Sequence, residues 1–153
     1  MSSTGTLTMD AELRSAVASD LPAIERLLTA SALPLAGVAD TLPGFVVAES
    51  DGAIVGTAAL EVCNDNALLR SVAVAPEWRS RGLGRALVTR VTADAESRGI
   101  RALYLLTTTA DHYFPSFGFH PVARDVVPSD VRATEEFQSA CPASATVMCR
   151  KCA

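Results

Sequence analysis

The sequence predicts an α/β fold with a mixed, mostly antiparallel, twisted sheet of about six to seven strands flanked by about four helices. The chain has 153 residues, which suits a single domain with a sizeable core. Apolar and β-branched runs alternate with helix-like segments along it. Residues 45–50 and 53–62 flank Asp51-Gly52, which favours an antiparallel hairpin. We therefore expect one domain over residues 11–153, after a flexible tail over residues 1–10.

Before the hairpin, the chain is expected to form a strand and a helix. Residues 13–17 are typical of a strand. In the helix that follows, Ser19 or Asp20 is the expected N-cap, and Pro22 suits the first turn. Residues 33–42 lie beside two prolines and are expected to form a loop or a second short helix.

Residues 68–98 form the segment around which the rest is organised: a strand, a turn and a long helix. The strand at residues 71–75 is apolar, partly β-branched and closed by Pro76. Leu83, Leu87 and Val91 recur every fourth residue, which predicts one buried face of a helix. Further strands are expected at residues 101–106, 119–123 and 145–151, with a short helix at about 111–117 and a helix-like run within 126–140.

Composition excludes several classes of protein. The formal net charge of −4 argues against nonspecific nucleic-acid binding, which depends on neutralising phosphates. No segment approaches the roughly 20 apolar residues that span a bilayer. The first residues lack the basic start and apolar stretch of a signal peptide. We expect a cytoplasmic protein with no nucleic-acid and no membrane partner.

The cysteines are expected to be reduced thiols, as is usual for a cytosolic protein. Cys149 and Cys152 have a Cys-x-x-Cys spacing, but they lack the second pair or the histidines that a zinc site needs. We expect no metal site, although two such thiolates would also suit a soft metalloid.

The turn at residues 79–84, Arg-Ser-Arg-Gly-Leu-Gly, is the first candidate binding site. Gly82 and Gly84 have no side chains, so a ligand can come close to the backbone there. The first N–H groups of the helix lie at the same place and have no partner within the helix. Free N–H groups at the positive end of a helix dipole bind anions, most often phosphate. The chain has no Gly-Lys-Ser/Thr sequence of a P-loop here, and Leu87 stands where the dinucleotide fingerprint needs its third glycine. An anion-binding turn is favoured over a plain tight turn.

Two motifs carry a resemblance to a known family. Arg79-x-x-Gly82-x-Gly84, after a strand ending in Val-Ala-Val-Ala-Pro, resembles the acetyl-CoA pyrophosphate motif of the GNAT N-acetyltransferases. Residues 113–119, Tyr-Phe-Pro-Ser-Phe-Gly-Phe, resemble the later Tyr-x-x-x-Gly-Phe segment of that family. Residues 68–76, 103–109 and 141–145 look like the small acetyltransferases encoded with arsenic-resistance genes, the ArsN type.

This resemblance implies the GNAT fold and acetyl-CoA as cofactor, with direct transfer of acetyl to a primary amine. The pantetheine arm would lie like an added strand beside Val72, Ala73 and Val74. The pyrophosphate would lie over the N–H groups from Arg81 to Arg85. Thr107 stands where the family often has an asparagine that helps to hold the cofactor. The cofactor-binding residues implied are Val72, Ala73, Val74, Arg79, Ser80, Arg81, Gly82, Leu83, Gly84, Arg85 and Thr107.

The catalytic residues are a base that takes a proton from the amine and an acid that protonates the departing thiolate. Glu61, a carboxylate within a strand, is the candidate base; a solvent-facing role for Glu61, or a water chain as the base, is left open. The family's acidic tyrosine usually stands where this chain has Phe114. Tyr113 is therefore the candidate acid, with protonation by water alone as the alternative.

Arg70 and Ser71 are the candidate substrate-binding residues. A guanidinium binds an acidic group bidentately, but Arg70 is equally suited to a salt bridge with Glu61 or Asp65. Enzymes related to the ArsN type acetylate the α-amino group of glutamate analogues that carry a phosphinate or an arsinate. The resemblance thus implies an N-acetyltransferase for a small-molecule amine, in the context of arsenic or antimetabolite resistance. The alternatives are a non-catalytic acyl-CoA sensor and a protein N-acetyltransferase. The sequence does not settle the oligomeric state; a homodimer is one candidate, because dimers are common in the family.

Overall fold

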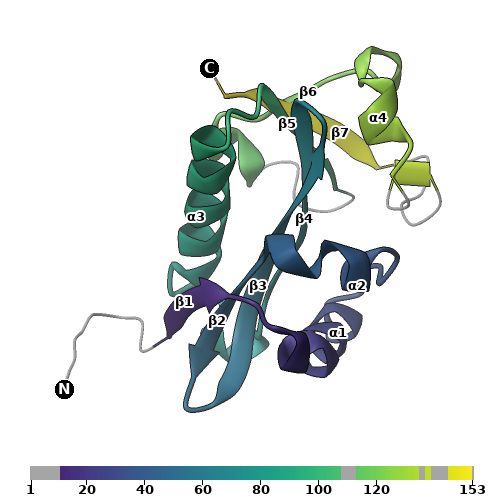
Figure 1. Ribbon diagram of the computed structural model, residues 1–153. Helices are drawn as coiled ribbons and strands as arrows, with labels where there is room; N and C mark the ends of the chain where they lie inside the picture. The colour runs from purple at the N-terminus through teal and green to yellow at the C-terminus, as the bar shows by residue number, and fades with distance from the viewer. Residues whose placement is uncertain (1–10, 108–112, 135–136, 139–144, 153) are drawn as a thin grey trace.

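Seven strands form one twisted sheet in the computed structural model, which describes residues 11–107, 113–134, 137–138 and 145–152 (Figure 1). The strand order is β1-β2-β3-β4-β5-β7-β6. Only the β4–β5 pair is parallel among the pairs of this described sheet, so the sheet is mostly antiparallel as expected. The strands are β1 Glu12–Ser15, β2 Phe45–Ser50, β3 Ala53–Cys63, β4 Asn66–Val74, β5 Ala102–Thr107, β6 His120–Pro121 and β7 Thr146–Lys151.

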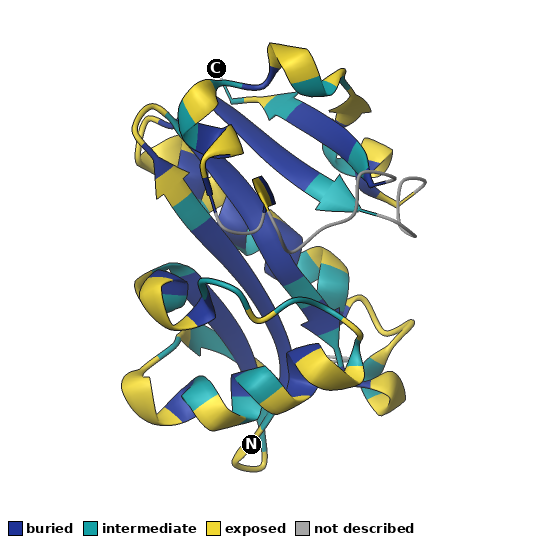
Figure 2. Ribbon diagram, turned by 90° about the vertical axis from the view of Figure 1, so that its right-hand side faces the viewer, coloured by how far each residue is buried: buried dark blue, intermediate teal, exposed yellow. Residues whose placement is uncertain are grey.

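The helices cover both faces of this sheet. Helix α3 lies on one side, and α1 and α2 lie on the other (Figure 1). Figure 2 shows the middle strands almost wholly buried between them, while the helices expose their outer sides. The helices are α1 Leu21–Ala30, α2 Val38–Thr41, α3 Leu83–Ser97 and α4 Ser129–Arg132. The predicted α/β class and the predicted sheet of about six to seven strands are confirmed.

Helix α3 packs on the sheet through the face that its periodicity predicts. Leu83, Leu87 and Val91 are all buried, and Gly56 of β3 makes room for the first two. A Cβ atom at Gly56 would lie 2.8 Å from Leu87 Cδ1, closer than real carbon atoms approach. The missing side chain on β3 therefore sets how closely α3, and the turn before it, approach the sheet.

Three expectations about local structure are corrected. Asp20 precedes α1 as predicted, but its carboxylate does not cap that helix. It accepts instead from the Val17 N–H and from the Arg14 guanidinium. The helix expected at 111–117 is a 3-10 turn at Phe114–Phe117, with Pro115 near its start and Gly118 after it at φ +91°; residues 108–112 lie outside the described part.

The strand expected at 119–123 is shortened to the two residues of β6, although the next residue, Val122, still donates its N–H to the Val147 carbonyl of β7 at 2.9 Å. In its described part, the helix-like run within 126–140 contains the short α4, which begins just after Pro128, and two further helical residues at 137–138.

The parallel strands β4 and β5 diverge, and this divergence opens the sheet at its centre. Their pairing runs from Asn66–Ala102 to Leu68–Tyr104 and ends there. Both strands continue, β4 to Val74 and β5 to Thr107. The backbone edge of β4 beyond Leu68 therefore faces an opening in place of a neighbouring strand.

No helix in the described part of the chain is long and apolar enough to cross a membrane.

Candidate active site

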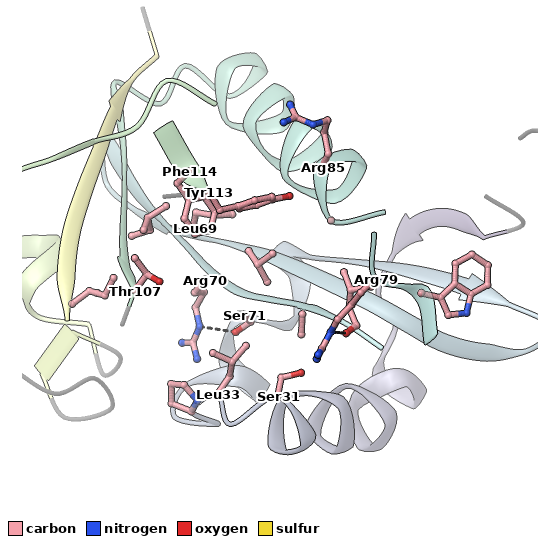
Figure 3. A pocket seen from close by; sticks show the side chains of 18 of the residues that line it. Ser31, Leu33, Leu69, Arg70, Ser71, Arg79, Arg85, Thr107, Tyr113 and Phe114 are labelled. Atoms are coloured by element: carbon pink, nitrogen blue, oxygen red, sulfur yellow. Dashed lines mark hydrogen bonds between the residues drawn. The ribbon is translucent and has the colours of Figure 1, made fainter. Parts of the chain in front are cut away.

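A pocket of about 600 Å³ occupies the opening between β4 and β5. Figure 3 shows Arg70 and Ser71, with Leu33 and Ser31, on one side of it and Tyr113 with Arg85 on the other. Its wall combines the edge of β4 that faces β5, the end of β5, the turn before α3 and the segment that follows α1. The lining residues are Ser31, Leu33, Pro34, Leu69, Arg70, Ser71, Val72, Ala73, Val74, Trp78, Arg79, Ser80, Gly82, Gly84, Arg85, Leu105, Leu106, Thr107, Tyr113 and Phe114.

The turn before α3 presents backbone N–H groups at one end of this pocket. Gly82 has φ +84° and occupies the N-cap position, and Ser80 also has a positive φ, of +66°. The first helical hydrogen bond runs from the Ala86 N–H to the Gly82 carbonyl. The N–H groups of the first three helical residues therefore have no acceptor within the helix, and they add to the positive end of its dipole. This geometry suits a pyrophosphate.

Arginine side chains surround the same turn. Arg79 donates from Nε to the Val74 carbonyl at 3.0 Å, which ties the turn to the end of β4. Arg85 lies 4.7 Å from the ring centre of Phe117 and donates to Ser116 Oγ at 3.3 Å. The Arg81 guanidinium stacks 5.1 Å from the Trp78 ring centre. These cations give the turn end of the pocket a positive field that favours a phosphate-bearing ligand.

Tyr113 and Phe114 have different environments although they are adjacent. Phe114 is buried, and its ring packs edge-on against Phe119 with centroids 5.8 Å apart. Tyr113 is 38% exposed, and its hydroxyl lies 3.2 Å from the point that a Cβ atom on Gly84 would occupy. Burial raises the pKa of Tyr113, and nearby Arg85 only partly opposes that rise. The phenol therefore keeps its proton at neutral pH and offers it at the pocket.

Arg70 is wholly enclosed in the wall of the pocket. Its side chain has no accessible surface, while that of Glu61 is 24% accessible, and Arg70 Nη1 lies 3.2 Å from Glu61 Oε1. Arg70 Nε donates to Ser71 Oγ at 3.1 Å. Because that oxygen accepts from Arg70, the Ser71 hydroxyl hydrogen must point elsewhere. Of the two salt-bridge partners considered for Arg70, the structure shows Glu61.

The structure brings most of the predicted site residues to one pocket. Val72, Ala73, Val74, Arg79, Ser80, Gly82, Gly84, Arg85 and Thr107 line it, as do Arg70, Ser71 and Tyr113. Three predicted residues, Glu61, Arg81 and Leu83, are not among the lining residues. Leu83 points into the core, so only its backbone can serve a ligand. Sequence reasoning did not name Ser31, Leu33 or Pro34 as site residues, although the family resemblance implies that residues 33–42 cover the acceptor pocket.

The cysteines of the described chain are poor nucleophiles. Cys63, Cys149 and Cys152 are free thiols, and Cys141 lies outside the described residues. Burial raises the pKa of Cys63 to about 11 and also raises the pKa values of Cys149 and Cys152. These thiols therefore stay protonated at neutral pH. Within the described residues, no group of three or more His, Cys, Asp or Glu side chains could hold a metal ion.

Comparison with known protein families gives one match. Residues 42–121, which include the whole of β2 to β5 and the turn before α3, match the model described as an acetyltransferase (GNAT) domain.

Curated relatives and solved structures agree with this match. An amino-acid acetyltransferase of Aeromonas salmonicida is 38% identical over 86 residues, covering 55% of this chain and 20% of the relative. That of Serratia proteamaculans is 34% identical over 96 residues, covering 61% and 22%. The chain thus spans about a fifth of the length of these relatives.

Among solved structures, N-acetylglutamate synthase of Neisseria gonorrhoeae, complexed with coenzyme A and N-acetyl-glutamate, superposes with a TM-score of 0.80. It is 24% identical and covers 94% of this chain and 35% of its own, so it supports the fold. A Mycobacterium tuberculosis protein in complex with CoA is 25% identical, with a TM-score of 0.75, and covers 92% of this chain and 98% of its own.

Proposed function

Because this chain belongs to the GNAT acetyltransferase family, we propose that it transfers the acetyl group of acetyl-CoA to the α-amino group of a small acidic amino acid. The observation that carries the acceptor class is Arg70, a fully buried guanidinium in the wall of the pocket. Arg70 is already paired with Glu61 at 3.2 Å, so an anionic group of the acceptor would have to share this cation with Glu61. The attraction would be strong, because little water screens a buried cation. Glutamate, or a glutamate analogue that carries a phosphinate or an arsinate, has such a group.

The relatives support the acceptor class. The two curated relatives described above are named amino-acid acetyltransferases, and a structural neighbour was solved with N-acetyl-glutamate. The arsinate- and phosphinate-bearing analogues follow from the ArsN-type resemblance of residues 68–76 and 103–109. They test the same pocket, because each replaces one carboxylate of glutamate by another anionic group.

The proposed reaction forms a nitrogen–carbon bond and breaks a carbon–sulfur bond. The deprotonated amine attacks the thioester carbonyl carbon, and the CoA thiolate leaves. Tyr113 donates its phenolic proton to that thiolate, since its raised pKa keeps the proton available. Glu61 is the proposed acceptor of the amine proton; it does not line the pocket, so the proton would reach it through water.

The competing function is a GNAT-fold sensor that holds acyl-CoA without turnover. Phe114 favours it, because a phenylalanine stands where the family's tyrosine is usual. Tyr113 at the pocket favours the enzyme. Binding of acetyl-CoA without release of CoA, across a panel of amines, would establish the sensor.

The test is CoA release, measured with a thiol reagent after subtraction of the protein's own thiols. The panel contains glutamate, phosphinothricin, arsinothricin, alanine, spermidine and a short peptide. We expect turnover with the acidic amino acids and at least tenfold lower kcat/KM with alanine, which lacks the second anionic group. Equal turnover with alanine would overturn the acidic acceptor, and turnover only with the peptide would indicate a protein N-acetyltransferase.

Arg70→Lys tests the residue itself. Lysine keeps the charge but loses the planar fork, so we expect the KM for the acidic amino acid to rise at least tenfold, with little change in the KM for acetyl-CoA. Arg14→Lys is the matched control, because Arg14 is ion-paired outside the pocket. An unchanged acceptor KM in Arg70→Lys would contradict the role of Arg70.

A further inference from the structure

Strand β4 contains a bulge within the pocket wall. Ala59 of β3 pairs with Arg70 and Thr57 pairs with Ala73, so Ser71 and Val72 together face the single residue between those two. Ser71 has φ +59°, in the left-handed region that a serine rarely adopts. Such a backbone persists only where the surrounding contacts hold it.

Thr57 supplies the contact that holds this bulge. Its Oγ1 donates to the Ser71 carbonyl at 2.8 Å, and Thr57 has no exposed surface. Side chains alternate along a strand, so Thr57 points away from the face on which Gly56 meets α3. A hydroxyl buried there needs a hydrogen bond, and its bond goes to the bulge. The sequence shows no signal for this contact, since Thr57 lies within an ordinary apolar strand.

The bulge determines which backbone groups of β4 face the pocket. Along a strand, successive N–H and C=O groups point alternately to the two neighbouring strands. One extra residue reverses that alternation for every residue beyond it. The backbone orientation of Val72 to Val74, which lines the pocket, therefore depends on the conformation of Ser71.

We propose that Thr57 is a positioning residue for acyl transfer: its hydroxyl holds the bulge at Ser71 so that the following backbone of β4 is aligned with the thioester. Thr57 acts through Ser71 and does not touch the reacting atoms. The role assumes the acetyl transfer proposed above. A misaligned backbone group would reduce binding of the transition state more than binding of the substrate. Loss of the Thr57 hydroxyl should therefore lower kcat more than it changes KM.

The experiment compares Thr57→Val with Thr92→Val. Valine has nearly the shape of threonine and lacks the hydroxyl. Thr92 is also buried, and its Oγ1 donates to the Thr89 carbonyl at 2.9 Å within α3, outside the pocket. Each variant loses one buried hydroxyl–carbonyl bond, so both should show a similar, small fall in Tm. We expect Thr57→Val to lower kcat about tenfold or more, with the KM for acetyl-CoA changed less than about threefold.

Thr57→Ser provides the rescue, because serine keeps the donor. Its kcat should stay within about threefold of the parent value, and that of Thr92→Val within about twofold. Equal kcat in Thr57→Val and Thr92→Val, with a parent that turns over, would overturn the positioning role and leave the proposed function in place. A parent that binds acetyl-CoA but acetylates no amine would overturn both.

Discussion

At the scale of single residues, the adjacent side chains of Tyr113 and Phe114 lie in different environments. Phe114 is buried in the core, and Tyr113 brings its hydroxyl to Gly84 at the edge of the pocket. The 3-10 turn that follows, in place of the α-helix expected there, sets this division. In addition, Ser116 Oγ donates to the Tyr113 carbonyl at 2.9 Å, which fixes the start of the turn.

Tyr113→Phe should lower kcat by about 100-fold, the usual range for loss of a general acid, with little change in the KM for acetyl-CoA. The active form is the protonated phenol, whose pKa is raised above its ordinary value of 10.0. Activity that depends on it should therefore be lost only as the pH rises through that raised pKa, above 10. Tyr104→Phe is the control, because Tyr104 is a buried tyrosine outside the pocket lining. A parent rate in Tyr113→Phe would exclude Tyr113 as the acid.

Gly82→Val should abolish measurable acetyl-CoA binding, while Gly52→Val should leave it intact. Both glycines have φ near +80°, and a Cβ atom would meet nothing within 4 Å at either. The two variants thus incur the same backbone strain, about 1–2 kcal/mol, but only Gly82 borders the pocket. Isothermal titration with acetyl-CoA makes the comparison. Normal binding by Gly82→Val would refute the turn as the pyrophosphate site.

At the scale of elements, Arg14 links β1, β2 and the start of α1. Its Nε donates to Glu49 and its Nη1 to Asp20, each at 2.8 Å. Asp20 also accepts from the Val17 N–H at 2.8 Å. The Arg14 guanidinium holds the pKa of Asp20 below its usual range. A carboxylate that makes these bonds stabilises the corner where the chain turns from strand to helix.

Asp20→Asn should lower the free energy of unfolding at pH 7 by about 1–3 kcal/mol, as expected for bonds to a charged group. A depressed pKa contributes stability fully above the unfolded pKa, about 3.9, and loses it as the pH falls through the folded value. The gap between parent and variant should therefore shrink below about pH 4. Asp94→Asn, which removes an exposed pair with Arg90, should cost less than about 0.5 kcal/mol. Urea titration at several pH values measures both, and a constant gap would contradict the assignment.

Local signals predicted the hairpin and the long helix well. The β2–β3 turn at Asp51-Gly52 and the buried face of α3 depend on neighbours in the sequence, and both were predicted closely. The Ser71 bulge and the Arg70–Glu61 pair depend on the register between strands, which residue patterns do not encode. The glycine motif predicted the end of the pocket that lies at the turn before α3. The side of the pocket formed by the segment after α1 could be assigned to particular residues only from the folded structure.

At the scale of the whole molecule, the pocket is assembled from segments that are distant in the sequence. Four segments meet only when the sheet has formed: the segment after α1, the edge of β4, the turn before α3 and the segment around Tyr113. The divergence of β4 from β5 creates the space that they enclose. A ligand in this pocket would therefore contact segments from the N-terminal part of the chain, around residue 31, as well as from the region around Tyr113.

Acetyl-CoA should stabilise the whole fold for that reason. At 100 times its Kd, a ligand that binds only the native state adds about 2.7 kcal/mol. For a chain of this size we expect a rise in Tm of roughly 5–10 °C. Differential scanning calorimetry tests this, with Gly82→Val as the control that should show no rise. An unchanged parent Tm at saturating acetyl-CoA would contradict binding in the central opening.

The divergence of β4 and β5 also has a consequence for protein handling. A strand edge with unmatched amide groups is a template for another polypeptide, and most proteins shield such edges. Here the edge beyond Leu68 lies inside an opening that the cofactor is proposed to fill. We therefore predict that loss of acetyl-CoA leaves this edge open to pairing with another copy of the chain. Preparations kept with acetyl-CoA should form fewer aggregates on storage than those stripped of it.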